Sequence, residues 1–422
     1  MHIGIDFGTT NSAVAVAQPN NVTLAAFDSE KRRQTFRSVL CFHEVRDFGR
    51  RRTQTYAGDD AIEHYLSGAD GRFIQSLKSY LPSRALVGSN ILGRFYRFED
   101  LLSTLLRGLR VRAEGSLGSL GHQATVGRPV RFAGVDTPDD EEYALSRLRD
   151  SLIRVGFEEV RFEYEPVAAA YFYETRLDHD ELILVGDFGG GTTDFTVMEV
   201  GRNARVKSSR RIIGSDGIGI AGDSFDGAIV RHLVSPMLGK DALYRSMDKL
   251  LTIPAWLYLK LERWHHLSFL KSSDNMNVIR SLRTAALDPA PVELLIRIIE
   301  EDLGFELHRA IQRLKTELSS TSMSEFTFDV AGAQIRQRVT RQEFENWISE
   351  DLVRIAECLD RLMDKCGLAA KDIDRVFLTG GSSFIPSIRR LFENRFGASK
   401  ISTGSEFTSV AAGLALSALA AE

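Results

Sequence analysis

Two short stretches of the chain repeat the same order of acidic, glycine and hydroxyl residues. The first reads "GIDFGTTN" and contains Asp6, and the second reads "GDFGGGTTDF" and contains Asp187. Glycine lets a backbone approach a ligand closely, and successive amide groups in such a turn can bind an anion. A carboxylate beside a phosphate would repel it unless a cation lay between them. The two aspartates therefore indicate a Mg²⁺ site made mostly through water.

The structural alternative is a pair of β-hairpins with glycine turns and no ligand. A single copy would favour that alternative, but two copies with Asp, Gly and Thr in the same register favour phosphate binding. A nucleoside triphosphate with Mg²⁺ would then lie between the turns. The candidate phosphate-binding residues are Gly8, Thr9, Thr10 and Asn11 in the first turn, and Gly189, Gly190, Gly191, Thr192 and Thr193 in the second.

Apolar, β-branched stretches flank both turns and predict the strands that hold them. They read "MHIGID", "SAVAVAQ" and "VTLAAF" around the first turn, and "ELILVGDF", "DFTVMEV" and "ARVKSSRRII" around the second. Each half then has a strand that enters a glycine turn ("ATVGRP", "RVFLTGGSSFIP") and a helix of small residues ("VAAAYF", "VAAGLA"). The repeated order predicts two similar α/β lobes whose small-residue helices cross closely.

Composition excludes several other classes of protein. The chain has 422 residues, of which 43% are hydrophobic and 26% charged, and its net charge is −4, so binding to nucleic acid is not expected. Three cysteines are too few for a disulfide framework and favour a reducing cytoplasm. The N-terminus does not resemble a signal peptide, and the apolar run Val410 to Ala421 is too short to span a membrane.

Five motifs, in order along the chain, resemble the actin-like ATPase superfamily: "IDFGTTN", "EPVAAAY", "VGDFGGGTTDF", "TGGSSFIP" and "SVAAGLA". Within it, the chain resembles the nucleotide-binding domain of the DnaK-type heat shock protein 70 family, and especially the short chaperone-like proteins of the YegD type. The resemblance implies an α/β actin-like ATPase fold, with two duplicated ribonuclease H-like lobes around a nucleotide cleft. Lobe I would span 1–178 with an inserted subdomain at about 31–120. Lobe II would span 179–404 with an insertion at about 225–310, and a C-terminal helix in 405–422 would return to lobe I.

The resemblance also implies roles for particular side chains. Lys78 would reach the γ-phosphate and the attacking water, although a surface lysine is the alternative. Glu165 would order a magnesium-bound water together with Asp6 and Asp187, and it also suits the start of a helix before Pro166. The threonines at the phosphates would be Thr9, Thr10 and Thr192. The implied catalytic set is Lys78, Glu165, Asp187, Thr192 and Asp6, and the implied metal set is Asp6, Asp187 and Glu165.

The nucleoside would be held by residues later in the chain. The resemblance implies Gly222 near the ribose or phosphate, Lys315 and Ser319 on an adenosine-contacting helix, and a turn of Gly380, Gly381 and Ser382. Two arginines that sandwich adenine in the chaperones are replaced here by Thr316 and Phe384. Phe384 could stack on the base instead. The alternative is that Phe384 turns into the core with Ile385.

These matches imply a Mg-ATP-binding, slowly hydrolysing, chaperone-like switch. The expected cofactors are ATP or ADP with Mg²⁺, and K⁺ is an additional candidate cation. Because the sequence ends at Glu422, soon after the last motif, a peptide-binding domain is not expected. An unidentified protein partner is expected. Two alternatives stay open: a small-molecule kinase of the same superfamily, for which no general-base Asp could be assigned, and a filament-forming actin-like protein.

Overall fold

The computed structural model describes residues 2–19, 21–28, 33–47, 50–67, 71–135, 137–175, 177–201, 211–262, 270–301, 303–330, 333–403 and 408–420. Most of the strand predicted over "ARVKSSRRII" lies outside these ranges. The chain forms two compact units. The first comprises Met1–Ala221, Ile355–Ser383 and Ile388–Glu422, and the second comprises Gly222–Arg354 and Phe384–Ser387. The lobe and insertion boundaries given above remain predictions.

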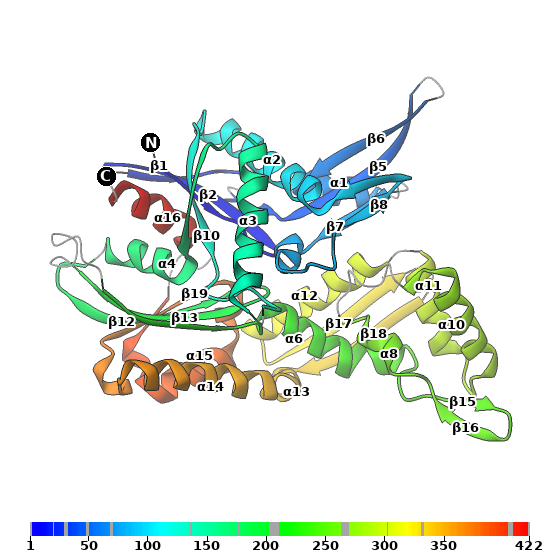
Figure 1. Ribbon diagram of the computed structural model, residues 1–422. Helices are drawn as coiled ribbons and strands as arrows, with labels where there is room; N and C mark the ends of the chain where they lie inside the picture. The colour runs from blue at the N-terminus through cyan, green and yellow to red at the C-terminus, as the bar shows by residue number, and fades with distance from the viewer. Residues whose placement is uncertain are drawn as a thin grey trace. The chain divides into compact units, whose positions relative to one another are not determined.

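The first unit contains two sheets with the same strand order (Figure 1). One has the order β3 (Asn21–Leu24), β2 (Asn11–Gln18), β1 (His2–Asp6), β10 (Gln123–Arg128) and β11 (Glu159–Tyr164), and β4 (Phe36–Arg37) also pairs with β2. The other has the order β14 (Arg211–Ile218), β13 (Thr193–Val200), β12 (Glu181–Phe188), β19 (Arg375–Thr379) and β20 (Ile401–Thr403). In both sheets the first three strands are antiparallel and the last three are parallel.

This topology places the functional motifs at the ends of central strands. Strands β1 and β12 are followed directly by the two glycine turns, and both are mostly buried apolar residues. Side chains of a strand covered on both faces are apolar almost throughout, which explains these runs. Because β1, β10 and β11 are parallel, their carboxyl ends lie at one edge of the sheet. Glu165, directly after β11, is therefore brought toward the turn that follows Asp6.

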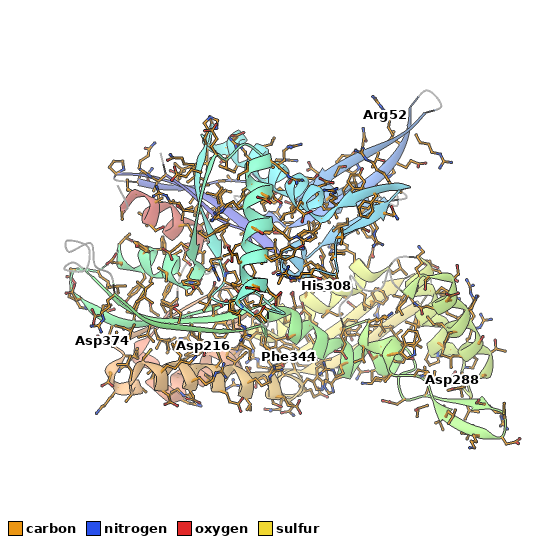
Figure 2. The ribbon with its side chains drawn as sticks, in the orientation of Figure 1. Arg52, Asp216, Asp288, His308, Phe344 and Asp374 are labelled. Atoms are coloured by element: carbon orange, nitrogen blue, oxygen red, sulfur yellow. The ribbon has the colours of Figure 1, made fainter. Side chains whose placement is uncertain are left out.

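The strands that the sequence analysis missed include β11 and β20, one in each of these two sheets. Both lie at the edge of a sheet. The residues of β11 ("EVRFEY") are half-buried or exposed, and β20 has three residues. Edge strands carry charge and are short, so they lack the apolar run by which a central strand is recognised. Asp374, labelled in Figure 2, fixes the register beside β12: its Oδ2 accepts the Leu182 amide at 2.8 Å, and its own amide donates to the Leu182 carbonyl.

The predicted close crossing of the small-residue helices is confirmed. Helices α4 (Glu165–Glu174) and α16 (Ser409–Ala420) pack against each other, and α16 also covers β1 and β2 (Figure 1). A Cβ at Gly413 would overlap the carbonyl oxygen of Ala168, and a Cβ at Gly4 would overlap the backbone of Ala411. These positions need glycine because backbone lies directly against backbone.

Helix α3 (Pro138–Arg154) has a clear start signal. The Thr137 hydroxyl accepts the Asp140 amide at 3.3 Å, Pro138 occupies the first turn, and three acidic residues follow. Each of these features stabilises a helix N-terminus. The helix buries Ala144, Arg147, Leu148, Ser151 and Leu152, which follow the three- and four-residue spacing of one helical face.

The first unit also contains further strands and helices. They are β5 (Val39–Asp47), β6 (Arg50–Ala57), α1 (Asp59–Leu66), β7 (Gly71–Gln75), η1 (Leu77–Tyr80), β8 (Gly88–Ile91), β9 (Arg94–Arg97), α2 (Phe98–Leu117), η4 (Ala370–Asp372) and η6 (Ala398–Lys400). Strands β6, β5 and β7 form a three-stranded sheet, and β8 pairs with β9. Three elements have residues in both units: η5 (Gly381–Phe384), α14 (Ser349–Cys366) and α15 (Pro386–Phe396).

The second unit is mainly helical with two β-hairpins. Its elements are α6 (Gly222–Ile229), η2 (Val230–Val234), α7 (Ser235–Met237), β15 (Leu243–Ser246), β16 (Lys249–Thr252), α8 (Trp256–Leu259), α10 (Ser273–Ala285), α11 (Ala290–Glu300), α12 (Gly304–Ser320), β17 (Met323–Val330), β18 (Ala333–Thr340) and α13 (Arg341–Trp347). Among the described residues of the whole chain, no helix combines the length and the apolar character needed to cross a membrane.

Candidate functional site

The first glycine turn is held by a short chain of hydroxyl groups. The Gly8 amide donates to Ser12 Oγ at 3.3 Å, and Ser12 Oγ lies 2.8 Å from Ser38 Oγ. A Cβ at Gly8 would overlap the carbonyl oxygen of Asn11, so the turn closes tightly only with glycine. The Asn11 side chain accepts a hydrogen bond from Arg37 at 3.1 Å. The predicted residues of this turn therefore form a tight loop that is held by Ser12 and Arg37.

The second glycine turn is supported by the turn that follows β19. The Gly189 amide donates to the Thr192 carbonyl at 3.0 Å, and the Ser382 hydroxyl donates to the Gly189 carbonyl at 3.2 Å. Gly380 has φ +82°, and a Cβ there would overlap the backbone of Phe188. The Thr193 hydroxyl donates to the Ile220 carbonyl at 2.7 Å. The predicted turn of Gly380, Gly381 and Ser382 is thus directly in contact with the second glycine turn.

The two glycine turns lie close to each other. A Cβ at Gly191 would be 3.4 Å from Thr9 Oγ1 and 3.6 Å from Ser79 Oγ. The structure therefore brings together three segments far apart in the sequence: the turn after β1, the turn after β12, and the short helix η1. Ser79 was not among the predicted site residues, since nothing in its sequence context marks it.

Lys78 and Glu165 form a buried ion pair. Lys78 Nζ donates to Glu165 Oε1 at 2.6 Å, and the two side chains are only 9% and 8% exposed. Lys78 belongs to η1, and Ser76 just before it has φ 58°, a left-handed conformation that is costly for a residue other than glycine. Lys78 is therefore not the surface lysine of the alternative interpretation.

Three aspartates lie close to this ion pair: Asp187 and Asp194 are buried, and Asp6 is partly exposed. Burial raises the pKa of Asp6 well above its usual range, and the nearby charges of Glu165 and Asp187 raise it further. Burial likewise raises the pKa of Asp187, with Glu165 and Asp194 adding to the effect. Burial alone would lower the pKa of Lys78, but Glu165, Asp6 and Asp187 together raise it. Lys78 is therefore held in its charged form.

This charge balance fits a bound cation. Four carboxylates, on Asp6, Glu165, Asp187 and Asp194, interact with one another and with the ammonium of Lys78, and all of them except that of Asp6 are buried. A divalent ion would offset the repulsion that raises the aspartate pKa values. Among the described residues, no three His, Cys, Asp or Glu side chains lie close enough together to hold a metal directly. An ion at this site would therefore be held largely through its water molecules.

Asp194 has a distinct set of partners. Its Oδ1 accepts the amides of Val130 at 2.9 Å and Arg131 at 3.3 Å. Burial raises its pKa to about 7, Glu165 raises it as well, and a hydrogen bond from Thr192 works in the opposite direction. Asp194 thus connects the second glycine turn to the loop after β10, a contact that the sequence did not reveal.

The predicted nucleoside residues of the second unit are partly engaged with one another. Lys315 Nζ donates to the Gly222 carbonyl at 3.0 Å and lies 2.7 Å from Asp226 Oδ1. The Ser319 hydroxyl donates to the Lys315 carbonyl at 2.9 Å. Lys315 and Gly222 are therefore in contact, which the sequence analysis did not predict, and buried Asp226, which it also missed, contacts Lys315.

Phe384 is half-exposed, whereas its neighbour Ile385 is buried. The ring of Phe384 is therefore not part of the core, and the alternative in which it packs inward with Ile385 is wrong. Thr316 bonds within its own helix, its hydroxyl donating to the Gln312 carbonyl at 2.8 Å.

Comparison with known families places most of the chain. A sequence model described as "Hsp70 protein" matches residues 2–252 and 300–420. The chain belongs to the Hsp70 family. Hsp70 proteins bind ATP or ADP, generally with Mg²⁺, so this chain is a nucleotide-binding protein of the chaperone-type ATPase class.

The Hsp70 match is interrupted at residues 253–299. This interval contains α8, α10 and all of α11 except Glu300. Every residue proposed above for the phosphates and for the nucleoside lies in the matched part of the chain. The candidate site residues thus lie in the matched portion, and the unmatched interval belongs to the second unit.

In this Hsp70 chain, we expect Asp194→Asn to stabilise the protein without nucleotide and Mg²⁺. The pKa of Asp194 is raised from 3.8 to about 7, so its ionisation in the folded state costs roughly 4 kcal/mol. In the wild type, the contribution of Asp194 to the free energy of unfolding is most favourable below about pH 4. It decreases as the pH rises toward about 7. The asparagine keeps an Oδ1 acceptor for the two amides. Its stabilising effect should therefore increase from pH 5 to pH 8, as measured by urea unfolding.

The matched control is Asp150→Asn, because Asp150 is an exposed residue on α3 and should give no comparable change. Identical pH dependence in wild type and Asp194→Asn would show that Asp194 does not carry this ionisation cost.

Proposed function

We propose that the protein is a Mg-ATP-binding switch that hydrolyses ATP slowly, with the phosphates held at the two glycine turns of the first unit. The observation that carries this proposal is the buried ion pair of Lys78 with Glu165, surrounded by Asp6, Asp187 and Asp194 and placed beside both turns. Phosphoryl transfer depends mainly on positioning and on compensation of phosphate charge, and these residues supply both.

Each group has a proposed role. Backbone amides and hydroxyls of Thr9, Thr10 and the second turn bind phosphate oxygens. Asp6, Asp187 and Glu165 would hold Mg²⁺ through its water ligands, and the ion would supply positive charge to the phosphates. The ammonium of Lys78, held at Glu165, is directed to the oxygens on which charge develops and to the attacking water. Burial strengthens these interactions because little water is present to screen them.

For the nucleoside, we propose contacts from the turn of Gly380, Gly381 and Ser382 in the first unit, and Gly222, Lys315 and Ser319 stay the contacts predicted from the sequence. The half-exposed ring of Phe384 can present a flat face to a base, which supports stacking as its role. Because Lys315 is paired with Asp226, it is oriented before any ligand binds. We also propose a cytoplasmic protein partner whose binding depends on whether ATP or ADP is bound. K⁺ is an additional candidate cation.

Replacing Asp187 with alanine should weaken Mg-ATP binding at least about tenfold, since a carboxylate that orders the ion is lost. Titration calorimetry with Mg-ATP on both proteins measures the effect. The difference should shrink when Mg²⁺ is removed with EDTA, because the proposed role acts through the ion.

Asp150→Ala serves as the control, because Asp150 is an exposed residue on α3 in the same unit. Equal Mg-ATP affinity of the wild type and Asp187→Ala would mean that the nucleotide site has been placed wrongly.

A further inference from the structure

Arg147 is a buried arginine that the proposed mechanism does not yet use. It is 3% exposed, and its guanidinium carbon lies 3.9 Å from the centre of the Phe98 ring. Its nitrogens donate five hydrogen bonds, to the carbonyls of Tyr80 (3.3 Å), Leu81 (3.2 Å), Ser83 (3.1 Å) and Leu86 (3.0 Å) and to Glu99 Oε1 (2.6 Å).

Four of these acceptors belong to one segment, and that segment directly follows Lys78. The turn of η1 is closed by backbone bonds from the Ser79 amide to the Ser76 carbonyl (3.0 Å) and from the Leu81 amide to the Lys78 carbonyl (3.2 Å). Arg147 binds the chain where this turn ends. The left-handed conformation of Ser76 lies on the other side of Lys78 and persists only if the surrounding structure enforces it.

We propose that Arg147 is a positioning residue for Lys78. By holding the carbonyls of residues 80–86 against α3, it fixes η1 so that the ammonium of Lys78 lies at Glu165 and at the proposed phosphate site. This inference rests on the proposed ATP hydrolysis. It adds the residue that fixes the position of the Lys78 ammonium.

The contacts of Arg147 with residues 80–86, here called the clamp, require arginine in particular. A planar guanidinium can bind several carbonyls in fixed directions while stacking on an aromatic ring, as it does here on Phe98. A lysine would keep the charge but could neither stack in the same way nor reach all of these acceptors.

The test compares Arg147→Met and Arg147→Lys with Arg84→Met. Arg84 lies in the same segment, but its side chain is 58% exposed and its bonds go to Asp140 and the Asp139 carbonyl. In single-turnover assays, Arg147→Met should hydrolyse ATP about 10- to 100-fold more slowly, with ATP affinity within about threefold of wild type. Arg147→Lys should be intermediate, and Arg84→Met should match wild type.

A double variant separates positioning from a general structural role. If Arg147 acts through Lys78, adding Arg147→Met to Lys78→Met should give no further slowing. Multiplicative slowing, or wild-type rates in both Arg147 variants, would overturn the proposal. Should Arg147→Met fail to fold, Arg147→Lys alone carries the comparison.

Amide hydrogen exchange without nucleotide gives a readout that does not depend on hydrolysis. Residues 79–86 should exchange at least about tenfold faster in the Arg147 variant than in wild type, with no such change in Arg84→Met. Unchanged exchange would refute the clamp. If wild type and Lys78→Met hydrolyse ATP equally, the proposed function fails instead, and the exchange data still decide whether Arg147 holds the segment.

Discussion

Lys78→Ala is expected to slow ATP hydrolysis by roughly 100-fold or more while leaving Mg-ATP binding largely intact. The reason is that the buried ammonium compensates charge that develops on the phosphate oxygens only as the reaction proceeds, and loss of one such group costs about 10² to 10³ in rate. Single-turnover assays measure the hydrolysis step, and calorimetry on the same preparations measures affinity.

The change also leaves Glu165 buried without its partner, which destabilises the fold and could disguise a chemical effect. The variant Lys78→Met with Glu165→Gln removes both charges and should recover part of the lost stability. This variant should still hydrolyse ATP slowly, because the rate depends on the ammonium of Lys78, whereas the stability depends on leaving no unpaired buried charge. Hydrolysis at the wild-type rate in a folded Lys78→Ala protein would remove Lys78 from the mechanism.

Gly413→Ala is expected to destabilise the protein by about 3 kcal/mol or more, although alanine is the better helix former. The added Cβ would overlap the carbonyl carbon and oxygen of Ala168. These are backbone atoms of α4, so they cannot rotate away, and the two helices must separate. Because α4 begins at Glu165, the shift should also disturb the ion pair with Lys78. Urea unfolding without nucleotide measures the loss.

Gly115→Ala is the matched control within another helix. Gly115 lies in α2, and a Cβ there would have no atom within 4 Å. The same substitution should therefore stabilise the protein by about 0.5–1 kcal/mol, since alanine loses less backbone entropy. If both substitutions moved stability in the same direction, the close packing of α16 on α4 would not be the feature that constrains Gly413.

The sequence by itself determined the parts of this protein that depend on local backbone chemistry. Two glycine turns after acidic strand ends could be recognised because the turn, the strand and the hydroxyls lie within a few residues of one another. The crossing helices were recognised because small residues recur along each of them. The same motifs led to the Hsp70 family, which the family match confirms for residues 2–252 and 300–420.

Only the tertiary structure decided which distant side chains meet. Lys78 and Glu165 are 87 residues apart, and Asp194 binds amides more than 60 residues away. Arg147 reads in the sequence as one of several arginines on a charged helix, and only its burial against residues 80–86 gives it a role. The edge strands β11 and β20 were likewise invisible, because pairing with a neighbour defines them and their own residues do not. Such contacts depend on how sheets and helices pack, and no local pattern in the chain records that packing.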